Sequence, residues 1–94
     1  MIRRVRILTA AQLDLLRLED FLVDKAPHAA ARAALSISQA IESLSELSER
    51  GRPSPLPGVR ELVVPFSGAA YVIRYRVTTD EVIVARIFHS REGR

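Results

Sequence analysis

The chain has 94 residues, of which 48% are hydrophobic and 27% charged, and it carries a formal net charge of +3 and no cysteine. This length fits a single domain over residues 1–94, and the composition is that of an ordinary soluble globule rather than a disordered or membrane protein. The absence of cysteine excludes disulfides and thiolate metal sites, and it suits a reducing cytoplasm, which is the expected location.

The charge is divided unevenly along the chain. Residues 1–8 hold three arginines and no acid, residues 9–49 hold three basic and seven acidic residues, and residues 50–94 hold eight arginines and four acids. Polar residues follow the first arginines, so no apolar signal region exists, and no run is long enough to span a membrane. Thirteen of the fourteen cationic residues are arginine, whose guanidinium binds phosphates and carboxylates in a bidentate manner. An anionic partner is therefore one interpretation of the C-terminal half.

The N-terminal region predicts a short strand followed by a helix. Residues 5–8 are a strand candidate, and Thr9 with Gln12 three residues later has the pattern of a capping box for a helix over residues 10–25. Leucines and other apolar residues recur there at helical spacing. The expected apolar face consists of Ala11, Leu15, Leu18 and Leu22, widened by Leu13, Leu16 and Phe21.

A second helix is predicted over residues 28–50, with Pro27 at its start and Gly51 as its C-terminal cap. Its apolar residues form one stripe, and small alanines in that stripe would let it pack closely against the first helix as a hairpin. The predicted stripe is Ala30, Ala33, Ala34, Ile37, Ala40, Ile41, Leu44 and Leu47.

Three prolines make residues 52–58 an extended connector that is neither helix nor central strand. Strands are predicted over residues 59–64, 70–77 and 82–89, and the short segments between them favour an antiparallel meander. The order β-α-α-β-β-β predicts an α+β fold, with a helical hairpin packed on one face of a small, mainly antiparallel sheet.

Alternation along the last two strands predicts which side chains share a face of the sheet. The set expected toward the helices is Ile73, Tyr75, Val77, Ile83, Ala85 and Ile87. The set expected on the open face is Arg74, Arg76, Val84, Arg86 and Phe88. Arg60 shares a side with Leu62 and Val64, but the sequence does not fix which face that is. His89 alternates with the helix-facing set at the end of its strand.

The chemistry-bearing residues exclude several classes of site. The histidines have no metal-ligand spacing, no Gly-x-Ser-x-Gly elbow is present, and no glycine-rich phosphate loop occurs, so neither a metal nor a cofactor is expected. A metal-free ribonuclease would need cations for the phosphorane and a group that moves protons. The candidates for those roles are Arg60, Arg86 and His89, whereas the tyrosines are expected to be packing residues.

In element order, and in the segments Gly58-Val-Arg-Glu-Leu62, Tyr71-Val-Ile-Arg-Tyr75 and Val84-Ala-Arg-Ile-Phe-His-Ser-Arg91, the chain resembles the RelE/ParE toxins of bacterial type II toxin–antitoxin pairs. The resemblance covers nearly the whole chain. It implies a small basic toxin, associated with plasmid stabilisation and growth inhibition, that is neutralised by a cognate, ParD-like antitoxin. It also places Arg60 and Arg86 at the family's second-strand and last-strand arginines, and His89 near a C-terminal histidine of some nucleolytic members.

The resemblance leaves two targets open. RelE-like members cut messenger RNA on the ribosome, often with a tyrosine near the C-terminus, whereas ParE-like members inhibit DNA gyrase. No tyrosine follows residue 75 and Lys25 is the only lysine, so we favour gyrase inhibition by protein contact, with a ribosome-dependent endonuclease as the alternative. A nucleic-acid-binding sheet ranks last because the aromatic residues that stack on bases are missing. Residues expected to contact the target or partner are Arg74, Arg76, Arg86, His89 and Arg91.

Overall fold

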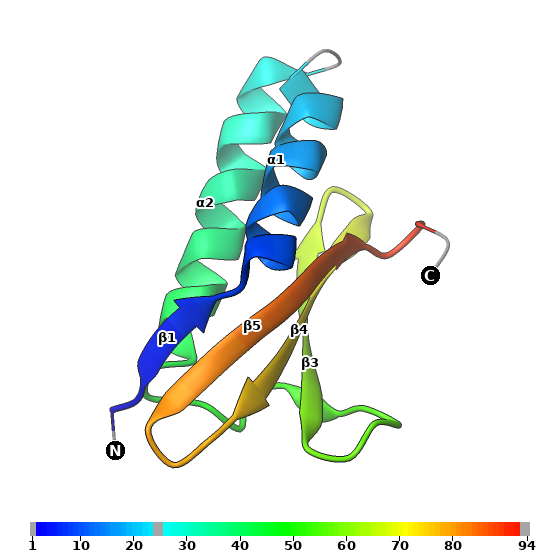
Figure 1. Cartoon of the computed structure of the whole chain (residues 1–94). Helices are drawn as coiled ribbons and strands as arrows, with labels where there is room; N and C mark the ends of the chain where they lie inside the picture. Colours follow the sequence, from blue (N-terminus) through cyan, green and yellow to red (C-terminus); the bar gives the residue numbers. More distant parts are fainter. Residues whose placement is uncertain (1, 24–25, 93–94) are drawn as a thin grey trace.

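In the computed structural model, which describes residues 2–23 and 26–92, two helices lie side by side on one face of a five-stranded sheet (Figure 1). This confirms the predicted α+β class and the helical hairpin. The predicted end of the first helix, residues 24–25, lies outside the described residues. The elements are β1 (Arg4–Ile7), α1 (Thr9–Val23), α2 (Pro27–Ser43), β2 (Arg52–Pro53), β3 (Val59–Phe66), β4 (Ala69–Val77) and β5 (Glu81–His89).

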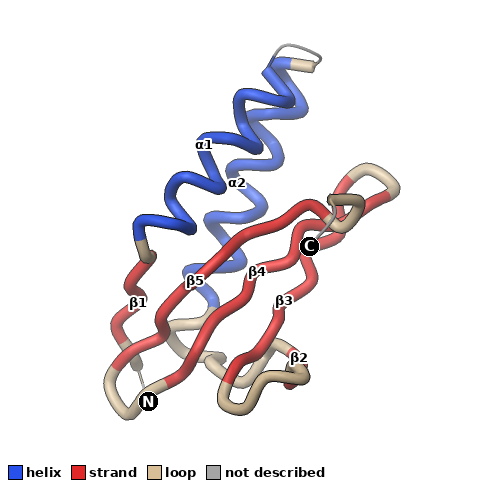
Figure 2. Tube along the Cα trace, turned by 45° about the vertical axis from the view of Figure 1, so that its right-hand side comes forward, coloured by secondary structure: helices blue, strands red, loops and turns tan. Residues whose placement is uncertain are grey.

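The strands follow the order β1-β5-β4-β3-β2 across the sheet (Figure 2). β1 runs parallel to β5, and the other neighbours are antiparallel. The β3–β4 hairpin turns through Ser67 and Gly68, whose φ angles of 50° and 79° are the left-handed values that a two-residue turn requires. The connector also contains the short strand β2, which was not predicted. A proline is tolerated there because β2 lies at the edge of the sheet.

The core lies between the helices and the sheet. It includes the fully buried side chains of Leu44, Ile73, Tyr75 and Ile87, and the alanines of α2 let that helix approach closely. Burying an aliphatic or aromatic side chain stabilises the fold by about 1.5–3 kcal/mol, so this one cluster holds the two layers together. None of the described helices is long and apolar enough to cross a membrane.

The start of α1 and the end of α2 differ from the prediction. Thr9 is already the first residue of α1, and the Gln12 side-chain amide donates to the carbonyl of Ile7 at 2.9 Å rather than completing a capping box. α2 begins at Pro27 as predicted, but it ends at Ser43 instead of residue 50. Serine hydroxyls that bond to nearby carbonyls compete with the helical pattern in this segment, and Ser43 itself donates to Ala40 O at 2.6 Å.

Gly51 is therefore not the cap of α2. It lies after the turns that follow the helix, and its N–H donates to the buried hydroxyl of Tyr75 at 2.8 Å. A Cβ atom at this position would lie 2.7 Å from that hydroxyl and 2.9 Å from the carbonyl oxygen of Glu61. Glycine is needed here because two other parts of the chain approach its backbone so closely.

A β-bulge in β5 overturns part of the predicted face assignment. Tyr75 pairs with Val84 and Arg74 pairs with Arg86, so Ala85 is the extra residue on β5. Val82 and Val84, rather than Ile83 and Ala85, are consequently buried against the helices. Beyond the bulge the prediction holds again, with Ile87 in the core.

The prediction of a wider apolar face on α1 was also wrong. Leu13, Leu16 and Phe21 are 57–63% exposed, while Ala11 and Leu18 are buried. The buried stripe of α1 is narrow because only one side of the helix contacts α2 and β5. The outer side of the hairpin therefore keeps several large apolar side chains in solvent.

Candidate functional site

Two arginines lie next to each other on the open face of the sheet. Arg74 on β4 and Arg86 on β5 are direct cross-strand neighbours, and Phe88 lies two residues beyond Arg86 on the same face. The guanidinium carbons of Arg74 and Arg86 are 5.2 and 5.1 Å from the centre of the Phe88 ring. Both distances are within the range of a cation–π contact. The fold thus brings these two predicted residues together around one aromatic ring.

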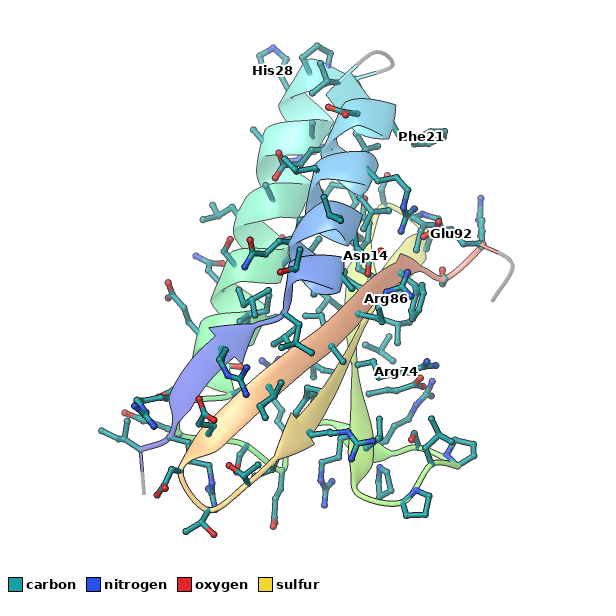
Figure 3. All side chains as sticks on the ribbon, viewed as in Figure 1. Asp14, Phe21, His28, Arg74, Arg86 and Glu92 are labelled. Atoms are coloured by element: carbon teal, nitrogen blue, oxygen red, sulfur yellow. The ribbon has the colours of Figure 1, made fainter. Side chains whose placement is uncertain are left out.

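Arg86 is held by a carboxylate from the first helix. Its Nε and Nη2 atoms donate to Asp14 Oδ2 and Oδ1 at 2.8 and 3.1 Å, and the backbone N–H of Ile87 donates to Oδ2 at 2.8 Å. Figure 3 shows Asp14 projecting from α1 toward Arg86 at this border of the sheet. A two-pronged contact of this kind fixes the plane of the guanidinium.

The same contacts determine the protonation of the pair. Burial of Asp14 by itself would raise the pKa of the carboxyl, but hydrogen bonds from Arg86 and from the Ile87 N–H outweigh it and hold the pKa below its ordinary value. The hydrogen bond to Asp14 in turn raises the pKa of Arg86. The pair is therefore ionised at neutral pH, and the charge of Arg86 is matched by one from its own chain.

Arg74 has a similar partner on the neighbouring strand. Its Nη2 and Nε atoms donate to Glu61 Oε2 at 3.0 and 3.3 Å, and Arg52 approaches the other oxygen of Glu61 at 3.6 Å. Charges of opposite sign thus alternate from β2 across β3 and β4. Arg76 differs, because it is exposed and its side chain makes no ion pair or hydrogen bond with any other described residue.

His89 and Arg91 form a second group at the end of β5. The His89 ring meets the ring of Tyr71 edge-on, with centroids 5.4 Å apart, and its Nδ1 accepts from the backbone N–H of Arg91 at 3.1 Å. In the neutral imidazole this places the ring proton on Nε2. Glu92 accepts from the His89 N–H at 2.7 Å and pairs with Arg17 of α1.

A pocket of about 590 Å³ lies between this group and the C-terminal half of α1. Leucine and aromatic side chains form its apolar part, and charged side chains and the imidazole form its polar part. Its lining residues are Arg17, Leu18, Phe21, Leu22, Tyr71, His89, Arg91 and Glu92. A surface with an apolar floor and cations beside it fits a partner's side chain better than it fits a bare phosphate.

Arg60 is not part of either group. It pairs with Tyr75 across β3 and β4, so it lies on the helix-facing side, opposite to the face of Arg74 and Arg86. Its Nη1 donates to the carbonyl of Gly51 at 2.6 Å, which fastens the turn after α2 to the sheet. The candidates Arg60, Arg86 and His89 therefore do not meet at one point in this structure.

The tyrosines are buried, and burial raises the pKa of both Tyr71 and Tyr75. The hydroxyl of Tyr75 donates to Ser48 O at 2.8 Å and accepts from Gly51 N–H, so it is a structural group. Among residues 2–23 and 26–92, no three histidine, aspartate or glutamate side chains are placed to hold a metal ion.

Sequence reasoning missed Asp14 and Glu92 as members of the site. Asp14 carried a detectable signal, since it interrupts the apolar stripe of α1 between Ala11 and Leu18, where a solvated acid does not belong. Its side chain is only 5% exposed, which a carboxylate tolerates when it is paired and hydrogen-bonded. Glu92 carried no such signal, because the groups that bind it come close to it only in the folded chain.

Comparisons with known proteins match the chain to toxins of type II toxin–antitoxin systems, some named ParE and some named RelE. A family model described as ParE toxin of type II toxin–antitoxin system, parDE, matches residues 5–93. The chain is 43% identical over 90 residues to Toxin RelE1 of Caulobacter vibrioides, covering 96% of each chain, and 43% identical over 84 residues to Toxin RelE3 of the same organism, covering 89% of this chain and 90% of the relative. A solved structure titled chromosomal ParDE TA system from P. aeruginosa superposes with a TM-score of 0.81 at 25% identity, covering 96% of this chain and 98% of that chain. The chain therefore belongs to the ParE toxin family of type II toxin–antitoxin systems, within the RelE/ParE superfamily.

Proposed function

We propose that this toxin inhibits DNA gyrase by protein contact and is neutralised by a ParD-like antitoxin. The observation that supports this proposal is that three arginines of the sheet are already bound to groups of the same chain. Arg74 and Arg86 are each bound to a carboxylate of the same chain, and Arg60 fastens a turn on the other side of the sheet. Arginines held in this way keep a fixed shape and have part of their charge matched by carboxylates of the same chain, which suits recognition of a protein more than stabilisation of a phosphorane.

The described part of the chain brings no acid–base pair together on the sheet, and this points the same way. Proton transfer requires a catalytic group within hydrogen-bond reach of its substrate, together with cations at the developing charge. His89 lies beside Tyr71 at the end of β5, whereas Arg86 is directed toward α1. The matching family model and the matching solved structure both carry the name ParE, and no tyrosine follows residue 75. These observations accord with a non-nucleolytic toxin.

A supercoiling assay with purified gyrase tests the proposal. The chain should block supercoiling at stoichiometric or modest excess, and Arg76→Glu should weaken the block, because Arg76 is exposed and can change without breaking an internal pair. Arg32→Glu is the control on the helical side of the sheet, since Arg32 is an exposed cation on α2 that makes only a long contact with the ring of Phe66, at 5.9 Å from its centre. Full supercoiling at a large excess of folded toxin would refute gyrase as the target.

The second candidate is a ribosome-dependent messenger RNA endonuclease. Its support is that three relatives carry the name RelE, and that His89 and Arg91 lie together beside a pocket. This function predicts codon-dependent cuts on translating ribosomes that disappear in His89→Ala. Cleavage that is unchanged in this variant would remove His89 from the mechanism, and no cleavage by the unmodified toxin would remove the function.

The proposed antitoxin completes the system. The exposed apolar side chains of α1 and the pocket beside Phe21 offer an amphipathic helix a surface of mixed chemistry, with arginines for its acidic residues. Co-expression with the product of an adjacent short reading frame should restore growth and yield a stable complex. Growth arrest that persists with that product present would contradict this assignment of the partner.

A further inference from the structure

The backbone groups along the edges of the sheet show where another strand can pair. An edge strand exposes N–H and C=O groups that a second chain can use, unless other groups already occupy them. β5 extends beyond the end of β1, and there its outward donors are occupied. Ile87 N–H donates to Asp14 at 2.8 Å, and His89 N–H donates to Glu92 at 2.7 Å. Two carboxylates thus close this part of the edge.

The opposite edge, on β3, is also largely closed. Val59 N–H donates to Leu56 O at 3.2 Å, which shows that the odd-numbered residues of β3 point their backbone groups away from β4. Glu61 is opposite Arg52 of β2, and Pro65 has no N–H to offer. Only Val63 among the described odd-numbered residues of β3 presents an unoccupied outward N–H.

β1 is different, because it presents two such donors in succession. Arg4 N–H donates to Asp80 O at 2.9 Å and Leu8 N–H to Val84 O at 3.0 Å, so the even-numbered residues of β1 bond to β5. Val5 and Ile7 therefore direct their backbone groups outward. The Ile7 carbonyl accepts from Gln12, but no described residue bonds to the N–H and C=O of Val5 or to the N–H of Ile7.

The side chains of β1 specify the chemistry of a strand that could pair there. Val5 and Ile7 pack against the core on the helical side, while Arg4 and Arg6 are exposed on the other side. Arg6 Nε donates to Glu81 Oε2 at 3.2 Å, which leaves its Nη groups for a partner. A strand beside β1 would place its own alternate residues next to each of these sets. Opposite charges and β-branched residues are the favourable cross-strand neighbours, and a cationic partner would be repelled.

We propose that the outer edge of β1 binds an extended segment of the antitoxin in which acidic residues alternate with β-branched ones. Figure 2 shows β1 as the outermost strand on its side of the sheet. The pairing would use the two outward N–H groups and the Val5 carbonyl for backbone bonds, and Arg4 together with the Nη groups of Arg6 for selection by charge. The inference rests on the proposed function only in naming the antitoxin as the source of this segment.

The test uses the full-length toxin labelled with nitrogen-15 and a synthetic peptide that alternates glutamate and valine. Binding should protect the amides of Val5 and Ile7 from hydrogen exchange and leave those of Ile87 and His89 unchanged. A peptide with lysine in place of glutamate should not bind. Protection at Val63 instead of Val5, or equal binding of the lysine peptide, would overturn the assignment of the edge or of its charge preference.

Val5→Pro gives the sharper test, because it removes an outward N–H that has no partner in the folded chain. Val5→Ala is the matched control, since it trims the side chain but keeps the donor. We expect Val5→Pro to weaken peptide binding about tenfold relative to Val5→Ala, as the loss of one or two net hydrogen bonds implies. Equal affinities would refute pairing through this edge.

Circular dichroism of each variant shows whether the proline is tolerated. If Val5→Pro does not fold, the double variant Arg4→Glu, Arg6→Glu replaces it and should reverse the preference, so that the lysine peptide binds. An unreversed preference would refute the proposal. Gyrase inhibition by the toxin alone is a separate measurement, so a failure of the edge proposal leaves the supercoiling result intact.

Discussion

Replacing Asp14 by asparagine or alanine should cost far more stability than replacing any exposed acid of the same helix. The carboxylate accepts from Arg86, Arg17 and the Ile87 N–H, and it is only 5% exposed. Removing one partner of a buried ion pair typically costs about 3–5 kcal/mol. The Arg86 side chain is 46% exposed and can regain water, so that range is an upper bound here.

The expected cost is therefore about 2–4 kcal/mol for Asp14→Ala, of which roughly 1–3 kcal/mol comes from leaving the Ile87 N–H without an acceptor. Asp14→Asn keeps one oxygen for that N–H, but it loses the charge and turns an amide toward a guanidinium, so about 1–2 kcal/mol is expected. Urea unfolding measures both values. A domain of this size should lose about 4–8 °C in Tm for each kcal/mol.

The pH dependence supplies an independent check. Because the folded-state pKa of Asp14 is lowered from its ordinary 3.8, the carboxylate adds stability above about pH 4 and loses it as the pH falls toward the lower, folded-state pKa. The difference in unfolding free energy between the unmodified chain and Asp14→Asn should shrink over that acid range. Asp20→Asn, an exposed acid of α1, should stay within about 0.5 kcal/mol at every pH.

Two results would refute this reasoning. The first is an Asp14→Asn variant as stable as Asp20→Asn at neutral pH, which would mean that water replaces the carboxylate at the β5 edge without loss. The second is a stability difference that stays constant from neutral pH down to the acid range. That outcome would attribute the effect of the substitution to shape and packing rather than to charge.

Two further substitutions and two single-residue deletions test the packing described above. Gly51→Ala should destabilise the fold by about 1–3 kcal/mol in urea unfolding, because its Cβ would lie under 3 Å from the Tyr75 hydroxyl and from a backbone carbonyl. Tyr75→Phe should cost about 1–3 kcal/mol by leaving a buried carbonyl and N–H unpaired, and a change under 0.5 kcal/mol would show that neither needs the hydroxyl. Deleting Ala85 should leave a folded chain by circular dichroism, because it removes only the bulge residue and keeps the pairs on both sides in register, whereas deleting Ile83 should unfold it.

The sequence predicted the order of elements except for the two-residue strand β2, and the reason is physical. Apolar periodicity of about 3.6 or 2 residues is local information, and Pro27, the prolines of the connector and the Ser67-Gly68 turn are local signals as well. The strand boundaries of β4 and β5 followed from that pattern to within one residue. The family was also visible in the segments around Arg60, Tyr71 and Arg86.

The faces of β5 were not predictable in the same way. A strand read with strict alternation places Ile83 and Ala85 in the core, and only the pairing with β4 shows that Ala85 is a bulge residue. The predicted end of α2 was wrong for a related reason. Its apolar stripe continues to Leu47, but the chain leaves the helix at Ser43 to reach the buried hydroxyl of Tyr75 through Ser48 and Gly51.

The sequence by itself determined a small basic α+β domain of the RelE/ParE kind, with arginines gathered on its last strands. Only the tertiary structure decided what those arginines do. It places Arg86 against Asp14, Arg74 against Glu61, and Arg60 on the helix-facing side of the sheet. Cations that look alike in sequence therefore have different partners. The physical reason is that an ion pair depends on distance in space, and Asp14 and Arg86, 72 residues apart, meet only when α1 packs along the edge of β5.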